Sequence, residues 1–89
     1  AAQRVARSRA FLRQVLEAYG RKCCMCAAAG SLPDGRSELE AAHIVSRASL
    51  GADDVRNGLA LCRVHHWAFD RGVIRIESDH TIKFDPAFL

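Results

Sequence analysis

Apolar side chains recur every three to four positions over residues 3–19, which is the period of an amphipathic helix. Arginines occupy the other side of this helix, and Gly20 is placed to end it. The apolar stripe consists of Val5, Leu12, Leu16 and Tyr19. Phe11 and Val15 widen it. We expect this stripe to pack against the rest of the fold.

Short apolar runs separated by polar loops make up the rest of the chain. Residues 38–45 (ELEAAHIV) predict a strand, and residues 59–62 (LALC) predict a second strand that returns beside it. Residues 63–71 (RVHHWAFDR) have helical character, and residues 73–76 and 81–84 flank a turn as a hairpin. The order of helix, strand, strand, helix and hairpin predicts an α+β fold.

The chain of 89 residues is long enough for one small domain, whose core alone would be only marginally stable. We therefore expect a staple such as a bound metal. The single domain would consist of a basic helix (residues 1–20), a cysteine knuckle with the central strands and helix (residues 21–72), and a C-terminal hairpin and tail (residues 73–89). Because the sequence starts AAQRV without a methionine, we expect it to be a piece of a larger protein.

Positive charge is concentrated near the start of the chain. Residues 1–22 carry six basic side chains against the single Glu17, whereas the remainder carries seven basic and nine acidic side chains. A basic arm on a near-neutral body is typical of proteins that bind a polyanion such as nucleic acid, and a solvated helix face is the alternative. No apolar run approaches the roughly 20 residues of a membrane span, and nothing resembles a signal peptide, so we expect no membrane partner.

The four cysteines, Cys23, Cys24, Cys26 and Cys62, are too tightly clustered for two unstrained disulfides, which favours metal binding. Cys23-x-x-Cys26 and Cys62-x-x-His65 supply three thiolates and one imidazole, a standard structural zinc set. Cys24 is left over. We expect it to be a small buried apolar residue, with a place in a C-x-C ligand pair as the alternative.

Two adjacent histidines point in different directions if residues 62 onward form a helix, because successive residues are rotated by ~100°. Cys62 and His65 then share one face, and His66 and Asp70 share another. A histidine with one carboxylate leaves coordination positions open, as a catalytic metal site requires. A plain surface contact between the two residues is the alternative.

His43 lies near the end of the first predicted strand among apolar neighbours, where a hydrogen-bonded core histidine would be ordinary. If the two strands and the helix fold as a β-β-α unit, however, His43 comes to lie over the helix face that bears His66. There a neutral imidazole can take a proton from water beside a metal-bound phosphate.

Four motifs in order, YGRKCCMC, LEAAHIV, NGLALC and HHWAFDRG, resemble the HNH nucleases, which have the ββα-metal fold. The likeness is greatest to the HNH domains of bacterial modification-dependent (type IV) restriction endonucleases, and it covers residues 19–72. The three namesake positions would be His43, Asn57 and His66. The resemblance implies a small zinc-stapled domain that cleaves DNA in the bacterial cytoplasm.

The family pattern also implies residue roles. His43 would be the general base that activates water, and His66 and Asp70 would be ligands of a catalytic divalent ion. Asn57 would either fix its loop and orient the base histidine or bind metal directly, although Asn-Gly is also a common turn pair.

One position departs from the pattern. Many HNH enzymes have Asp or His just before the base histidine as a further metal ligand, and this chain has Ala42 there. Water or phosphate would fill the gap, or Glu40, which shares the strand face of Ala42, would reach in. A solvated strand carboxylate is the simpler interpretation of Glu40.

These assignments predict hydrolysis of a DNA phosphodiester to 5′-phosphate and 3′-hydroxyl ends with Mg²⁺ or Mn²⁺, although an imidazole ligand also suits Co²⁺ or Ni²⁺. Contacts with the DNA backbone would come from Arg4, Arg7, Arg13 and Arg63. Trp67 is more typical of half-buried packing, and His80 receives no role. Cleavage of both strands would need a homodimer or two encounters, and target choice would lie in another domain.

A zinc-stapled nucleic-acid-binding module without catalysis is the rival interpretation. It accounts for the zinc set and the basic arm equally well, but it leaves His43, Asn57, His66 and Asp70 as coincidence. A redox protein is disfavoured because the C-x-x-C motif lacks βαβ surroundings.

Overall fold

The computed structural model describes residues 2–88 and begins with helix α1 (Ala2–Ala18). Gly20 and Arg21 both take left-handed backbone conformations, with φ of 66° and 58°. The Arg21 N–H donates to the Leu16 carbonyl over 2.8 Å, as in a Schellman-type helix end. The helix thus lies within one residue, at each end, of the one that the sequence predicts.

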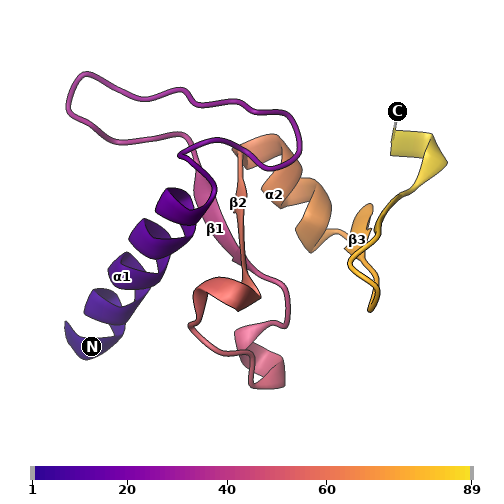
Figure 1. The fold of residues 1–89 in the computed structure, drawn as a ribbon, viewed down its shortest axis with the longest axis horizontal. Coiled ribbons are helices and arrows are strands. Elements are labelled where there is room, and N and C mark those ends of the chain that lie inside the picture. The colour runs from indigo at the N-terminus through magenta and orange to yellow at the C-terminus, as the bar shows by residue number, and fades with distance from the viewer. Residues whose placement is uncertain (1, 89) are drawn as a thin grey trace.

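Two short antiparallel strands form the centre of the molecule, β1 (Glu40–His43) and β2 (Gly58–Leu61). Residues 40–43 lie opposite residues 61–58 in register. Helix α2 (Arg63–Asp70) follows β2 after one residue. α1 lies on one side of this hairpin and α2 on the other (Figure 1). The predicted α+β class and the β-β-α order are confirmed.

A second hairpin and three single-turn helices complete the fold. Strands β3 (Ile74–Ile76) and β4 (Ile82–Phe84) pair antiparallel, as predicted, at the far end from α1 (Figure 1). The 3-10 turns are η1 (Arg47–Ser49) and η2 (Val55–Asn57), both in the loop between β1 and β2, and η3 (Pro86–Phe88). Among residues 2–88, no helix has both the length and the apolar character needed to cross a bilayer.

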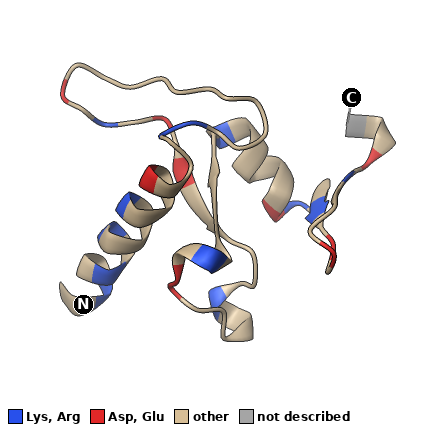
Figure 2. Cartoon of the chain, viewed as in Figure 1, with Lys and Arg blue, Asp and Glu red and all other residues tan. Residues whose placement is uncertain are grey.

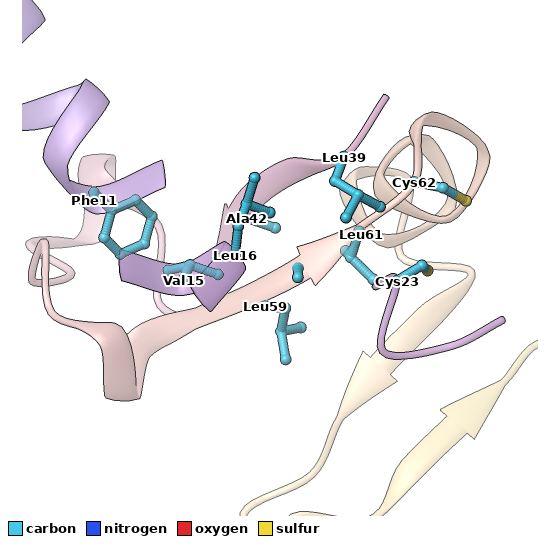
Figure 3. Close-up of a cluster of buried hydrophobic side chains, with 10 residues drawn as sticks. Phe11, Val15, Leu16, Cys23, Leu39, Ala42, Leu59, Leu61 and Cys62 are labelled. Atoms are coloured by element: carbon cyan, nitrogen blue, oxygen red, sulfur yellow. The ribbon is translucent and has the colours of Figure 1, made fainter. Parts of the chain in front are cut away.

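The core runs from α1 across the central hairpin to the cysteine knuckle (Figure 3). Val15 of α1 is fully buried against β2, where Gly58 allows a close approach. A Cβ at Gly58 would lie 2.4 Å from Val15 Cγ2, so any larger residue would push the helix away. Cys23 and Cys62 close the opposite end of the core.

The buried face of α1 is narrower than the predicted stripe. Phe11, Val15 and Leu16 are buried, whereas Val5 is 49% exposed and Tyr19 is 36% exposed. The central strands have only four residues each, and the first half of α1 projects beyond them (Figure 1). Val5 is therefore only half covered by the described part of the chain.

Candidate functional site

The four predicted zinc ligands converge on one point. The Sγ atoms of Cys23, Cys26 and Cys62 and a ring nitrogen of His65 all lie within 4.8 Å of one another. The Cys26–Cys62 sulfur separation is 3.9 Å, and His65 Nδ1 lies 3.7 Å from Cys23 Sγ and 3.1 Å from Cys62 Sγ. Bonds of about 2.3 Å to sulfur and about 2.0 Å to nitrogen put tetrahedral S···S and S···N edges near ~3.8 and ~3.5 Å. The cluster could therefore hold a zinc ion.

Local hydrogen bonding favours the thiolate form of Cys23, which is the form that a metal requires. Burial alone would raise the pKa of Cys23, but backbone N–H groups directed at its sulfur lower that pKa below its ordinary value. One of these donors is the Met25 N–H, 3.4 Å from Cys23 Sγ. A thiolate that already receives hydrogen bonds is better prepared to bind a cation.

Cys24 differs from its expected place. It is exposed rather than buried, and it does not join the cluster. Its backbone N–H instead donates to the Ala60 carbonyl over 2.9 Å, which ties the knuckle to β2. Partial desolvation, followed by the nearby Cys23 charge, raises the pKa of Cys24 to about 11, so its thiol stays protonated at neutral pH.

His66 lies in different surroundings from His65. His66 lines a cleft of about 460 Å³ between α1, β1 and the start of α2, together with Glu40, His43 and Arg63. The predicted general base His43 and the predicted metal ligand His66 thus share one cleft, as the β-β-α argument requires.

Two carboxylates flank the His66 ring. Glu40 Oε1 lies 3.0 Å from Nδ1, and Asp70 Oδ2 lies 3.6 Å from Nε2. The Glu40 side chain is 46% exposed, so it is partly solvated, but β1 also holds it within reach of α2. Asp70 is on the opposite edge of the ring and is not part of the lining of the cleft.

His43 is held from two directions. Its ring stacks on Phe11 of α1 with centroids 4.2 Å apart and planes 11° from parallel. Its Nε2 lies 2.9 Å from Asp53 Oδ1, and Arg47 contacts the other Asp53 oxygen over 2.9 Å. The hydrogen bond with His43 lowers the pKa of Asp53, and the charges of Arg47 and Arg7 add to this effect.

Sequence reasoning did not find Asp53. The residue sits in the polar loop between the strands, where no periodicity marks it, and it reaches His43 only through the path of that loop. The one available signal was the pair of aspartates shortly before Asn57, which is equally typical of a turn.

Asn57 fixes the same loop. Its Oδ1 accepts the Val45 N–H over 2.8 Å, and its Nδ2 donates to the carbonyls of Val45 (3.0 Å) and Ala52 (2.9 Å). The side chain thus joins both ends of the segment that carries Asp53. Of the two roles left open by the sequence, this geometry matches the loop-fixing one.

The predicted backbone-binding arginines divide between two places. Arg63 lines the cleft, whereas Arg4, Arg7 and Arg13 are exposed on α1. Figure 2 shows basic residues along most of α1. Trp67, expected to be half-buried, is 54% exposed. The Arg71 guanidinium lies over its ring, 6.0 Å from the ring centre.

A model of the HNH endonuclease family matches residues 23–77, which is more than half of the chain. The chain belongs to the HNH endonuclease family. The match begins at the first zinc cysteine and includes both strands of the central hairpin and α2, so it spans the zinc cluster and most of the cleft. In this HNH domain α1 precedes the matched range. Neither the comparison with curated proteins nor that with solved structures found a match.

Proposed function

We propose that this HNH domain hydrolyses phosphodiester bonds of DNA, with His43 as the general base. The observation that carries the proposal is the single cleft shared by His43, His66 and Arg63. A base, a metal-type ligand and a guanidinium that can pair with phosphate are the groups that this hydrolysis needs. A module that only binds nucleic acid has no use for a base held in such a fixed orientation.

The surroundings of His43 support its role as base. With its Nε2–H donated to Asp53, the neutral ring carries its lone pair on Nδ1, which is therefore the atom that takes the proton from water. The lowered pKa of Asp53 keeps this carboxylate charged at neutral pH, and the charge stabilises the imidazolium that forms. Stacking on Phe11 limits rotation of the ring.

The donors around His66 fit a divalent ion, since one imidazole and a carboxylate leave positions for water and phosphate. Glu40 and His66 Nδ1 would hold the ion, because both line the cleft. Asp70 would accept a hydrogen bond from Nε2–H and fix the ring, rather than being a second ligand beside His66 as the sequence predicts. When bound, the ion stabilises negative charge on the phosphate and on the leaving 3′ oxygen. Carboxylate ligation favours Mg²⁺ or Mn²⁺, with Co²⁺ or Ni²⁺ as alternatives.

Positive charge supports DNA as the substrate. The Arg63 guanidinium can donate to non-bridging oxygens of the reacting phosphate, and Arg4 and Arg7 add salt-dependent affinity that reads no sequence. We extend the proposal to one domain within a longer bacterial, cytoplasmic enzyme of the modification-dependent restriction type. A further domain of that enzyme would choose the target, and two copies would cut both strands.

Nicking of a supercoiled plasmid in the presence of Mg²⁺ or Mn²⁺ tests the proposal. We expect the parent protein to convert the plasmid to the open circle and His43→Ala to lose the activity by about 10²–10⁴-fold, the usual contribution of a general base. Zinc content and thermal unfolding of the variant should match those of the parent. A parent protein that binds the plasmid but never nicks it with any of the four metals would make the domain a binding module.

A further inference from the structure

We propose that the DNA strand that leaves the catalytic cleft continues along a second groove, where Arg9, Arg13, Arg21 and Arg36 bind its phosphates. This inference deepens the proposed nuclease function and rests on it. Of the four arginines, only Arg13 stood out in the sequence as a phosphate contact.

The second groove, which we call the arginine groove, has a volume of about 390 Å³. Arg9 and Arg13 are four residues apart on α1 and so project from the same face of the helix. Arg21 joins them because its left-handed backbone turns the chain back over the end of α1. Arg36 comes from the long loop between α1 and β1, which lies past the C-terminal end of α1 (Figure 1).

The arginine groove adjoins the cleft. Both cavities are lined by Leu12, Ser37 and Leu39, which form the ridge between them. Leu12 is 37% exposed, so the ridge presents an apolar surface against which the sugar of a nucleotide can pack. A strand whose reacting phosphate lies in the cleft can therefore cross the ridge without leaving the surface of the protein.

The arginines of the groove are largely free to bind an anion. Among residues 2–88, the ion pairs include none of Arg9, Arg13 and Arg21. Arg36 pairs with Asp34 over 2.8 Å, but its side chain is 77% exposed, so it can also contact a ligand. Each guanidinium can donate two hydrogen bonds to the oxygens of one phosphate. Four of them along one groove therefore suit the successive phosphates of a nucleic-acid backbone.

The experiment measures binding of a short duplex of arbitrary sequence, over a range of salt concentrations, to the zinc-loaded His43→Ala chain. In this background the groove variant is Arg9→Gln/Arg21→Gln. The control is Arg71→Gln/Arg75→Gln, which removes the same charge from the residue after α2 and from β3; neither residue lines the arginine groove. Each lost phosphate contact lowers the slope of log affinity against log salt by about 0.7–0.9.

We expect the groove variant to lose about 1.4–1.8 of slope and roughly 30-fold in affinity at ~0.1 M salt, and the control to lose much less. Arg9→Lys/Arg21→Lys should restore most of the slope, because the charge returns. Equal losses of slope and affinity in the groove and control variants would contradict the proposed role of the arginine groove. So would a His43→Ala chain that does not bind the duplex measurably.

The two proposals fail separately in this design. If the groove variant loses affinity as expected but the parent protein never nicks plasmid, the nuclease function is wrong and the arginine groove stands as a nucleic-acid site. If the parent nicks plasmid but the groove variant binds DNA as well as its His43→Ala background, the nuclease function stands and the arginine groove is wrong. Free phosphate that competes as well as DNA would show that the groove takes a single anion, which also contradicts the proposal.

Discussion

His65 and His66 are consecutive in the chain, yet their rings lie in separate sites. His65 joins three cysteines, and His66 faces Glu40 across the cleft. The helix makes this separation unavoidable, because neighbouring side chains differ by ~100° around its axis. One short segment can therefore serve a structural cluster and a reactive cleft at once.

At the same scale, Asp53 is a positioning residue for His43. We expect Asp53→Asn to lower kcat for nicking by roughly 10- to 100-fold, part of the ~10²–10⁴ that a general base contributes, while DNA affinity stays the same. The amide can still accept a hydrogen bond but no longer supplies the charge that stabilises the imidazolium. Single-turnover nicking together with a binding titration separates the two effects. A variant with full kcat would show that the contact between Asp53 and His43 is only structural.

The two carboxylates beside His66 make a matched pair for a second test. Because Glu40 lines the cleft and Asp70 does not, we expect Glu40→Gln to raise the Mn²⁺ concentration needed for half-maximal nicking by about 10- to 100-fold. Asp70 would act only through the orientation of the His66 ring, so Asp70→Asn should raise this Mn²⁺ concentration less. The reverse order would return Asp70 to the place that the sequence predicts for it.

At the scale of elements, the side-chain amide of Asn57 fixes the path of the loop of residues 44–57. Asn57 makes three hydrogen bonds to backbone groups of this loop, and the loop in turn carries Asp53. Both ends of the segment are therefore fixed relative to β1, and the contact with His43 depends on that fixation.

We expect Asn57→Ala to lower the free energy of unfolding by about 1–3 kcal/mol, because three hydrogen bonds to backbone groups of the loop are lost and each contributes about 0.5–1.5 kcal/mol, nearer the lower value where it is exposed to solvent. Asn57→Asp distinguishes the two roles of the residue: a carboxylate cannot donate to the Val45 and Ala52 carbonyls, but it can bind a metal ion. Loss of both stability and nicking in Asn57→Asp supports the loop-fixing role. Full activity in this variant would favour direct metal ligation. Denaturant unfolding and the plasmid assay supply the two readouts.

The sequence predicted these elements well because their signals are local. Ligand spacings of two residues fix the zinc set wherever the segments lie, and the helical period of residues 62–70 separates the two histidines. Non-local contacts were harder to predict. The sequence offered Glu40 only as an alternative, because its contact with His66 depends on β1 lying beside α2. Asp53 was missed, because it reaches His43 only through an irregular loop. The exposure of Val5 likewise depends on how far the strands extend.

At the scale of the whole molecule, the zinc cluster closes one end of a small core. Cys23 and Cys62 are buried members of that core (Figure 3), and the cluster links the knuckle to the start of α2. The core residues number too few to make a domain of this length strongly stable without a staple.

Removal of the zinc should therefore unfold the domain rather than only loosen it. We expect a strong chelator to abolish cooperative thermal unfolding and most of the helical circular dichroism at about 25 °C, since binding of structural zinc contributes about 10 kcal/mol or more to such folds. Cys26→Ser should behave like the chelated parent protein, whereas Cys24→Ser, outside the cluster, should unfold like the parent with its zinc. A chelated chain that still melts cooperatively at an unchanged temperature would show that the core suffices.

The tandem histidines leave this domain no tolerance for a change of register. One residue inserted between Cys62 and His65 would bring a different side chain to the cluster and turn His66 away from His43, so scaffold and reactive pocket would be lost together. Shortage of zinc in the cell would have the same result by another route. Under the proposed function, newly synthesised protein would not cleave DNA until it had bound its structural zinc ion.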